Sequence, residues 1–158
     1  MNGKIVIKKS ATADTRSAAG LVAKEVLLAS SMQHIEDVKK AMEYFCRRLQ
    51  SKAECHDWTK VDYINAFHED FEKTQKTGCD FRTLEWFKIH ITKERHHLND
   101  RCPEDVDLFD VLERVADICM AGMGRSGKVY DDTLSPEILQ RAYRNTVKLL
   151  CSEIIVEE

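Results

Sequence analysis

Apolar residues along most of the chain recur every three or four positions, which is the period of an amphipathic α-helix. The longest such stretch covers residues 21–52 and includes Ile35, Met42 and Leu49. Ser30-Ser31 interrupts this stretch, so we expect either one long helix or two shorter ones. His34 lies next to the apolar stripe and is expected to point toward or beside the core.

Four further helices follow from the same periodicity. They are predicted over residues 61–76, 81–98, 103 to 122 or 124, and 135–151. Gly78 suits the left-handed turn that ends the first of them, and Ser135-Pro136 is a typical start for the last. The third is apolar around much of its girth, which predicts a central position. Its carboxylates Glu113 and Asp117, four residues apart on one face, therefore require partners.

The two ends of the chain carry short apolar runs. Residues 4–9 alternate Lys with Ile and Val, a pattern that favours a short strand. Residues 154–156 either form a second strand that pairs with the first or continue the last helix by one turn. The sequence therefore predicts an all-α bundle of five to six helices, with a short terminal β-ribbon if the two runs pair. We expect a single domain over residues 1–158, with its core between about 20 and 152.

Composition narrows the classes of partner. The chain has 158 residues, 43% of them hydrophobic, and a net charge of −3. This charge provides no basic field for extended nucleic acid, although a small phosphorylated ligand is compatible with it. No apolar run reaches the roughly 18 residues of a membrane span, and no signal peptide is recognisable. We therefore expect a soluble, cytoplasmic protein with no membrane partner. The six cysteines contain no CxxC pair and indicate a reduced compartment.

The candidate chemistry centres on His56-Asp57, at the end of the long helical stretch. Imidazole nitrogens and carboxylate oxygens are the ligands that hold Zn, Mn, Fe or Ni beside a catalytic water. Five of the six histidines fall in segments that are expected to face a common interior, and His68 is interpreted as a surface residue. Cys55, next to the pair, is a candidate soft ligand or nucleophile. The pattern favours a metal site.

His90, His96 and His97 fall in the helix predicted over residues 81–98. At 100° per residue, His90 and His97 are offset by about 20° and flank the apolar stripe together. His96 is rotated by roughly 120° from His90. Helical phase therefore favours His90 with His97.

Read in order, His34, His56-Asp57 and Asp117 resemble the H…HD…D pattern of the HD superfamily of metal-dependent phosphohydrolases. Lys60 stands three residues after the aspartate of the pair, as in the HD-x-x-K variants. Residues 115–117, Val-Ala-Asp, resemble the segment that carries the last ligand. The resemblance covers most of the chain.

The histidines between the two carboxylates extend this resemblance. His90 and His96-His97 are similar to the histidines of HD members that hold two metals. The run from Trp86 to His90, followed by the His pair, is also similar to small uncharacterised phage-encoded HD-like proteins; if this chain is phage-encoded as well, we expect it in the cytoplasm of the host cell. Two features depart from the family. No Gly-Tyr-Pro signature follows the His pair, which removes the support for cyclic-dinucleotide specificity, and Trp58-Thr59-Lys60 replaces the x-x-E-D of alarmone hydrolases.

The resemblance implies an HD-type helical bundle that hydrolyses a phosphate ester or anhydride of a small nucleotide. The implied cofactor is one or two divalent transition-metal ions of Mn, Fe, Ni, Co or Zn. The implied ligands are His34, His56, Asp57 and Asp117, with His90 and either His96 or His97 completing a second ion or binding phosphate. Asp57 and Lys60 take the catalytic roles, with Lys60 stabilising phosphoryl charge unless it is an ordinary solvated lysine.

A second phosphate motif follows Asp117. Residues 122–128 satisfy G-x-x-x-x-G-K, but Val129 stands where a P-loop needs Ser or Thr, and a helix rather than a strand precedes the motif. We interpret the glycines as the end of the helix, with Arg125 and Lys128 on a flexible loop at the rim of the site. There the two cations either contact substrate phosphate or only keep the loop soluble.

Two other functional classes stay open. One is a metal-containing nucleotide-binding protein that sequesters or regulates without turnover. The other is a structural helical domain without metal. Metal content separates the last class from the first two, and hydrolysis of nucleotides separates an enzyme from a binder.

Overall fold

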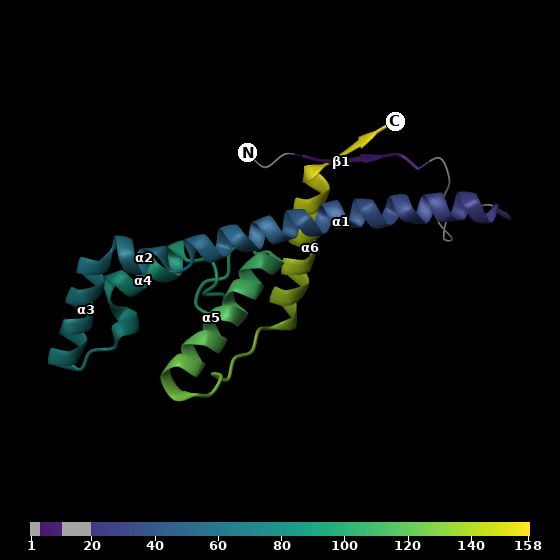
Figure 1. The fold of residues 1–158 in the computed structure, drawn as a ribbon. Helices are drawn as coiled ribbons and strands as arrows, with labels where there is room; N and C mark the ends of the chain where they lie inside the picture. The colour runs from purple at the N-terminus through teal and green to yellow at the C-terminus, as the bar shows by residue number, and fades with distance from the viewer. Residues whose placement is uncertain (1–3, 11–19) are drawn as a thin grey trace. The chain divides into compact units, whose positions relative to one another are not determined.

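The computed structural model describes residues 4–10 and 20–158, most of which are helical (Figure 1). In chain order the elements are β1 (Ile5–Lys8), α1 (Lys24–Cys55), α2 (Trp58–Asp62), α3 (Ile64–Thr77), the 3-10 helix η1 (Phe81–Thr83), α4 (Glu85–Lys93), α5 (Leu108–Ser126), α6 (Pro136–Glu153) and β2 (Ile154–Glu157). The expected helical architecture with a short terminal β-ribbon is confirmed. The described chain forms two compact units. The first contains the segments up to Arg48 and from Val147, and the second contains Leu49–Thr146.

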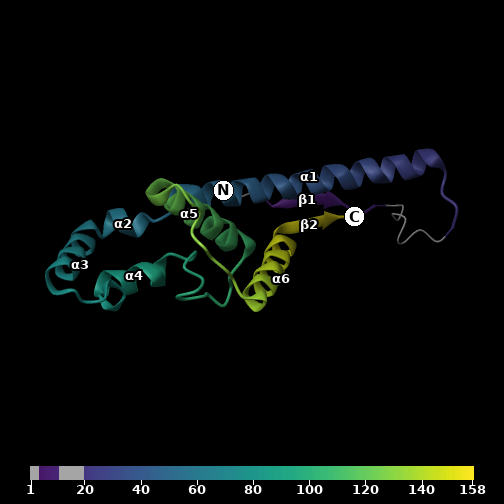
Figure 2. The same cartoon turned by 90° about the horizontal axis from the view of Figure 1, so that it is seen from below.

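The first unit contains the ribbon. β1 and β2 pair in parallel, with Ile5 opposite Ile154 (Figure 2). The Nζ of Lys4 donates to the carbonyl of Ser152 at 2.9 Å and so fixes the chain beside this pairing. α6 ends at Glu153, and β2 begins at the next residue. Of the two alternatives for the C-terminal run, the strand is therefore the one observed.

α1 is continuous from Lys24 to Cys55. The Ser31 hydroxyl donates to the carbonyl of Leu27 at 2.8 Å, so the helix accommodates the serine pair instead of breaking. The apolar stripe that was expected to pack in the core is largely exposed, with Ile35 at 65%, whereas Tyr44 is buried. Periodicity identifies the residues that share a face, but it does not reveal what covers that face.

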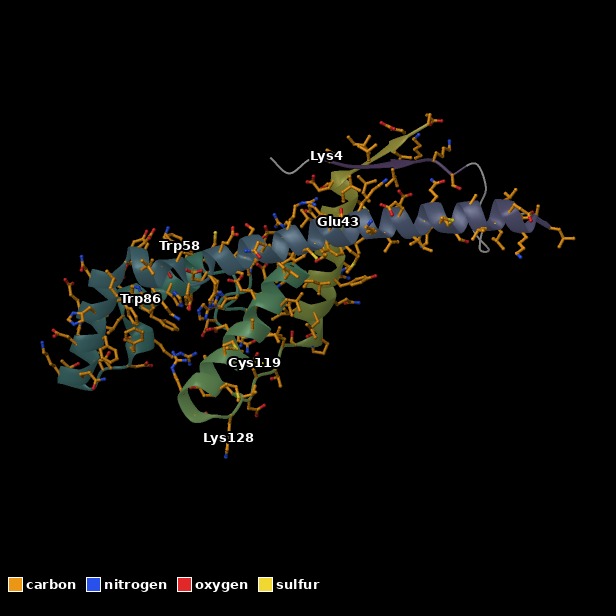
Figure 3. All side chains as sticks on the ribbon, viewed as in Figure 1. Lys4, Glu43, Trp58, Trp86, Cys119 and Lys128 are labelled. Carbon is orange, nitrogen blue, oxygen red and sulfur yellow. The ribbon has the colours of Figure 1, made fainter. Side chains whose placement is uncertain are left out.

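The second unit begins with α2, α3, η1 and α4, which contact one another (Figure 1). Phe67 of α3 stacks on Trp86 of α4, with ring centroids 4.0 Å apart, and Phe81 of η1 lies 5.7 Å from the same indole. Trp86 is labelled in Figure 3. The single helix predicted from residue 61 is wrong, because Tyr63 separates α2 from α3. This aromatic packing supports α4, which carries His90.

The helix predicted over residues 81–98 is wrong in its second half. α4 ends at Lys93, and Glu94 has an extended backbone with φ −89° and ψ 112°. At this break the buried Glu94 side chain accepts hydrogen bonds from the backbone N–H and the hydroxyl of Thr59. A tertiary contact of this kind can override helix propensity. His96 consequently lies in a turn, and His97 follows it outside any helix.

α5 begins at Leu108, five residues after the predicted start at Pro103. Asp107 is its N-cap, and the Asp107 carboxylate accepts from the backbone N–H of Asp110 at 2.9 Å. The Asp110 carboxylate in turn accepts from the backbone N–H of Asp107 at 3.1 Å. These reciprocal bonds form a capping box, which fixes the start of the helix.

The end of α5 lies beyond both glycines that were expected to stop it. The helix continues to Ser126, and Gly127 ends it in the left-handed region with φ 69°. Gly122 lies inside the helix, where a Cβ would meet the carbonyl oxygen of Lys128 at 2.5 Å and the backbone nitrogen of Tyr130 at 2.7 Å. The chain after α5 therefore packs against the helix at Gly122. The G-x-x-x-x-G-K segment is mostly helical and forms no phosphate-binding loop.

The core of the second unit lies where α5 and α6 meet the turns after α4. Its buried members are Leu98, Val106, Val111 and Ala142. Asn145 of α6 donates to the carbonyl of Val106 at 2.9 Å, which ties the helix to the chain before α5. Ser135 accepts from the backbone N–H of Ile138 at 3.3 Å, as expected for the cap of α6. All six cysteine thiols are free. None of the described helices is both long enough and apolar enough to cross a membrane.

Candidate metal centre

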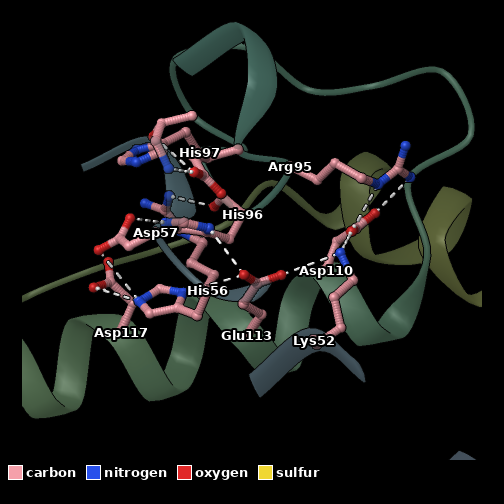
Figure 4. A network of polar contacts seen from close by, with 12 residues as sticks. Lys52, His56, Asp57, Arg95, His96, His97, Asp110, Glu113 and Asp117 are labelled. Atoms are coloured by element: carbon pink, nitrogen blue, oxygen red, sulfur yellow. Dashed lines mark hydrogen bonds and ion pairs between the residues drawn. The ribbon is translucent and has the colours of Figure 1, made fainter. Parts of the chain in front are cut away.

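The His-Asp pair stands at the turn between α1 and α2. Asp57 has φ 56° and ψ 24°, and it is the single residue other than glycine with a positive φ within residues 4–10 and 20–158. Aspartate tolerates this left-handed conformation better than most residues, although at some cost in free energy. Such local strain is found preferentially at functional sites. The turn places His56 and Asp57 beside Asp117 of α5 (Figure 4).

The Asp57 carboxylate faces histidines on both sides. Its Oδ1 lies 3.6 Å from the Nε2 atoms of both His90 and His96. Its Oδ2 lies 3.4 Å from Nε2 of His56 and accepts a hydrogen bond from Lys60. Burial alone would raise the pKa of Asp57, but the hydrogen bond and charge of Lys60 outweigh burial and lower the pKa. Asp57 is therefore an ionised carboxylate at neutral pH.

His56 is oriented by a carboxylate on α5. Its Nδ1–H donates to Oε1 of Glu113 at 3.1 Å. The lone pair of the ring is therefore on Nε2, which lies 3.6 Å from Oδ1 of Asp117 and faces Asp57 as well. A carboxylate that holds one ring nitrogen and directs the other inward is the usual arrangement behind a metal-binding histidine.

His90 is oriented by a relay of two buried residues. The Thr59 hydroxyl donates to Oε1 of Glu94 at 2.7 Å, so its oxygen is left to accept from Nδ1–H of His90 at 2.6 Å. The lone pair of His90 is therefore on Nε2, on the side of Asp57. Burial, with the neighbouring His97 next in importance, lowers the pKa of His90 to about 3. The ring is consequently neutral at neutral pH, which is the form that binds a metal.

His97 is hydrogen-bonded to His90. Its Nε2 lies 2.8 Å from Nε2 of His90, and because the latter carries the lone pair, His97 donates this hydrogen bond. Burial and the neighbouring His96 lower the pKa of His97. The pairing that helical phase favoured is thus present, but it is formed by a turn and not by one face of a helix.

His96 is the most buried of the histidines, with 1% of its surface exposed. Helical phase had directed it away from His90, and this expectation is wrong, because the helix ends before it. Neither of its ring nitrogens has a hydrogen-bond partner, and the same is true of Oδ1 of Asp57. Nδ1 of His96 lies 3.2 Å from Oε1 of Glu113 without hydrogen-bond geometry. Unpartnered buried polar atoms cost about 1–3 kcal/mol each, so this group requires an explanation.

The spacing of these atoms fits a divalent ion. Two ligand atoms at about 2.1 Å from one ion lie about 3.0 Å apart at right angles and about 3.4 Å apart at the tetrahedral angle. The N···O separations between Asp57 and the surrounding histidines are 3.4–3.6 Å. Four groups have ligand atoms within 4.8 Å of one another: His56, His96 and Asp117; Asp57, His96 and His97; Asp57, His90 and Glu94; and Glu94, His96 and Glu113. The residues present therefore fit one ion or two neighbouring ions.

A second polar cluster borders the first. Asp110 of α5 is fully buried and accepts hydrogen bonds from Lys52 Nζ at 2.5 Å and from Arg95 Nε and Nη2 at 2.9 and 2.8 Å (Figure 4). Lys52 also lies 3.1 Å from Oε2 of Glu113. Burial alone would raise the pKa of Glu113, but the neighbouring His96, the hydrogen bond from His56 and the charge of Lys52 hold it at about 2. Both clusters therefore carry ionised carboxylates.

A cavity of about 470 Å³ opens beside the ligand groups. Lys60 and Arg125 line it, whereas Lys128 does not. Arg125 is in the last turn of α5 rather than on the expected loop, and its Nη1 donates to the carbonyl of Ala121 at 3.2 Å. Lys128 lies in the turn after α5 and points away from the helix (Figure 3). Of the two expected phosphate contacts, the structure thus places one at the cavity.

Three other residues weighed in the sequence belong to none of the four groups. His34 is exposed on α1 in the first unit, and none of the four groups contains it. Cys55 is exposed and belongs to none of the groups. His68 is exposed, as expected for a surface residue.

Sequence reasoning missed three residues that orient the histidines. Thr59 and Glu94 fix the tautomer of His90, and Glu113 fixes that of His56. Glu113 had been recognised only as a carboxylate in need of a partner. A useful signal was the position of Glu94, a charged residue beside the His pair in a segment that was expected to pack inward. Thr59 gave no signal, because its role depends on contacts that the sequence does not encode locally.

Comparison of the chain with protein-family models, with curated proteins and with solved structures finds no match.

Proposed function

We propose that the protein is a metal-dependent phosphohydrolase that acts on a phosphate ester or anhydride of a small nucleotide. The observation that carries the proposal is the group of buried atoms without partners, Oδ1 of Asp57 and both ring nitrogens of His96. They face each other at 3.6 Å, among residues that are all common metal ligands. A cation bound between these atoms would recover the free energy that their desolvation costs.

Asp57 is proposed to join two sets of ligands. Its Oδ1 belongs with His90, His96 and His97, and its Oδ2 faces His56, whose Nε2 also lies near Asp117. A divalent ion bound here would supply activation of a water molecule and polarisation of a phosphoryl oxygen. Glu113 and the Thr59–Glu94 relay would hold the imidazole rings in the tautomers that bind metal.

The cavity is proposed to hold the substrate. A volume of about 470 Å³ lies within the range of small-molecule sites. Lys60 and Arg125 offer the positive charge that a phosphate requires. Lys60 is hydrogen-bonded to Asp57, so its ammonium group is close enough to reach a phosphoryl group bound beside the ligands. We therefore assign Lys60 the role of stabilising phosphoryl charge.

A second candidate function is binding of a nucleotide without turnover. It is favoured by one observation: the carboxylates nearest the ligands are already engaged. Glu113 is bonded to His56 and Lys52, and Glu94 is bonded to Thr59. Neither is free to protonate a leaving group, a step that general acid catalysis requires.

Two measurements test the proposal. Elemental analysis of protein purified without chelators should give about one or two transition-metal ions per chain, and a value below about 0.2 would rule out the site. A panel of nucleotides and generic phosphodiesters with added Mn²⁺ should then show release of phosphate or of a nucleotide product. Metal without turnover would select the binding protein instead.

A further inference from the structure

The cavity beside the ligand groups is lined entirely by α1, α2, α5 and the His56-Asp57 turn. On α5 the lining residues form two neighbouring rows with a spacing of four. One row is Leu112, Ala116 and Met120, and the other begins with Glu113 and Asp117. An apolar row therefore runs beside a row that begins with these two carboxylates and continues with Ala121 and Arg125. Across the cavity lining, α1 adds Leu49 and Ala53 to the apolar side chains.

The polar lining residues have partners that leave little for a substrate base. Lys52 and Glu113 are bonded to each other and to Asp110 or His56. The remaining ones are either in the ligand groups or are the cations Lys60 and Arg125. These two cations attract a phosphate more strongly than they attract a neutral nucleobase.

The backbone of the described residues that line the cavity also offers no hydrogen-bonding groups to a nucleobase. Nucleobases are read through hydrogen bonds to their edges, which requires free N–H, C=O or side-chain amide groups. In the interior of a helix the N–H and C=O groups are bonded to each other. Among the described residues that line the cavity, none has an amide side chain, and all but the two at the turn are helical.

We infer that the site recognises a nucleotide by its phosphate and by apolar contact with the face of its base, and that it does not distinguish one base from another. The inference rests on the proposed function, since it specifies the substrate of the same site. Pockets that use apolar contact separate related ligands by about 10- to 200-fold, whereas pockets that hydrogen-bond a substrate group reach about 10⁴–10⁵-fold. A cavity with this lining belongs to the first kind.

Calorimetric titration of the full chain, with its purified metal content, tests the inference. The ligands are the 5′-methylenephosphonate analogues of adenosine, guanosine, cytidine and uridine, whose P–C bond resists hydrolysis, and the same analogue of ribose without a base. We expect dissociation constants within about tenfold of one another for the four nucleosides and binding at least about tenfold weaker for the ribose analogue. A preference above about 100-fold for one base, equal binding of the ribose analogue, or no binding of any analogue would overturn the inference.

Two methionines of α5 provide a matched pair of variants. Met120 and Met123 are both exposed, at 72% and 51%, but only Met120 lines the cavity. Met120→Ala should weaken binding of all four nucleoside analogues by about three- to tenfold, to a similar extent for each. Met123→Ala should leave binding unchanged. Equal effects of the two variants, or an effect of Met120→Ala on one base alone, would contradict the inference.

Metal content and hydrolysis, measured on the same preparation, separate this inference from the proposed function. Base-independent binding by protein that lacks metal or turnover would refute the hydrolase and leave the inference standing. Hydrolysis by protein with bound metal, together with a strong preference for one base, would support the hydrolase and refute the inference.

Discussion

Two buried polar clusters lie next to each other in the second unit, and they differ in how completely their atoms are satisfied. In the cluster around Asp110, the carboxylate accepts three hydrogen bonds from Lys52 and Arg95. In the cluster around Asp57, Oδ1 of Asp57 and both ring nitrogens of His96 have no hydrogen-bond partner. The first cluster is complete within the chain, whereas the second leaves buried atoms without hydrogen bonds, which the proposed cation would satisfy.

The difference separates stability from binding. A buried charge with its counter-charges in place contributes to folding mainly because breaking the set is costly. A buried group without partners does the opposite, since it destabilises the free protein by the cost of desolvation and recovers that cost when a ligand arrives. Variants of the first cluster should therefore change the free energy of unfolding, and variants of the second should change metal content.

The largest effect is expected for Asp57→Asn. Asparagine tolerates the left-handed backbone, so the turn should be kept, while the charge that joins the two ligand sets is lost. We expect metal content to fall below about 0.2 ion per chain and hydrolysis to fall by about 10³-fold or more. Elemental analysis and initial rates measure the two effects.

The control for Asp57→Asn is the thermal midpoint of the metal-free protein. It should stay within a few degrees of the unsubstituted chain, because the ion pair that Asp57 forms with Lys60 is partly exposed, and such pairs contribute only about 0–1 kcal/mol. Unchanged metal content and hydrolysis would show that the ligand assignment is wrong.

Asp110→Asn should have the next largest effect, and on a different quantity. It removes the counter-charge of Lys52 and Arg95, and breaking a buried pair costs about 3–5 kcal/mol. Because Arg95 is partly exposed, we expect the free energy of unfolding of the metal-free protein to fall by about 2–3 kcal/mol. Urea denaturation measures this. Metal content per folded chain should be retained, and its loss would mean that the two clusters are not separable.

The unsubstituted chain and Asp110→Asn should also differ in how the free energy of unfolding depends on pH. Burial would raise the pKa of Asp110, but the hydrogen bonds from Arg95 and Lys52 lower it below the ordinary value. A lowered folded pKa contributes stability above the unfolded pKa of about 3.9, and this contribution is lost as the pH falls through the folded value. The difference between the unsubstituted chain and Asp110→Asn should therefore be constant above about pH 5 and shrink below about pH 4. A difference that grows with acid would contradict the assignment.

The sequence reveals those parts of the candidate centre that depend on local order. His56, Asp57 and Asp117 come together because the first two end a helix and the third faces inward from α5, and both features follow from apolar periodicity. His96 could not be placed in this way. Its position depends on the end of α4 at Lys93, and that end coincides with the contact between Glu94 and Thr59, 35 residues apart in the chain.

In the fold as well, features that depend on local sequence signals could be predicted, and features that depend on tertiary contacts could not. Caps and turn glycines predict the start of α6 and the end of α3 well, because these signals are local. The burial of α1 could not be predicted, because its stripe is as periodic as a core-facing one and yet Ile35 and Met42 are exposed. Periodicity alone does not distinguish the two cases.

Thr59→Val tests the support of the ligands with a smaller expected effect. Valine keeps the volume but removes the hydroxyl that accepts from His90 and donates to Glu94. Loss of such a supporting contact typically lowers metal affinity by about 10- to 100-fold. Competition with a chelator measures this affinity. Thr59→Ser should restore most of it, because serine keeps the hydroxyl, whereas equal loss in both variants would indicate a packing defect.

The smallest effect is expected for His34→Ala, and it distinguishes the geometry from the family pattern. The H…HD…D resemblance makes His34 a ligand, but the residue is exposed on a continuous helix in the first unit, and the ligand groups form without it. We expect metal content within about 10% of the unsubstituted chain, in contrast to His96→Ala, which should lose most of its metal because Nε2 of His96 faces Asp57 and has no hydrogen-bond partner. Elemental analysis of the two variants in parallel provides the measurement. If His34→Ala loses metal and His96→Ala retains it, the family pattern and not the unpartnered cluster identifies the ligands.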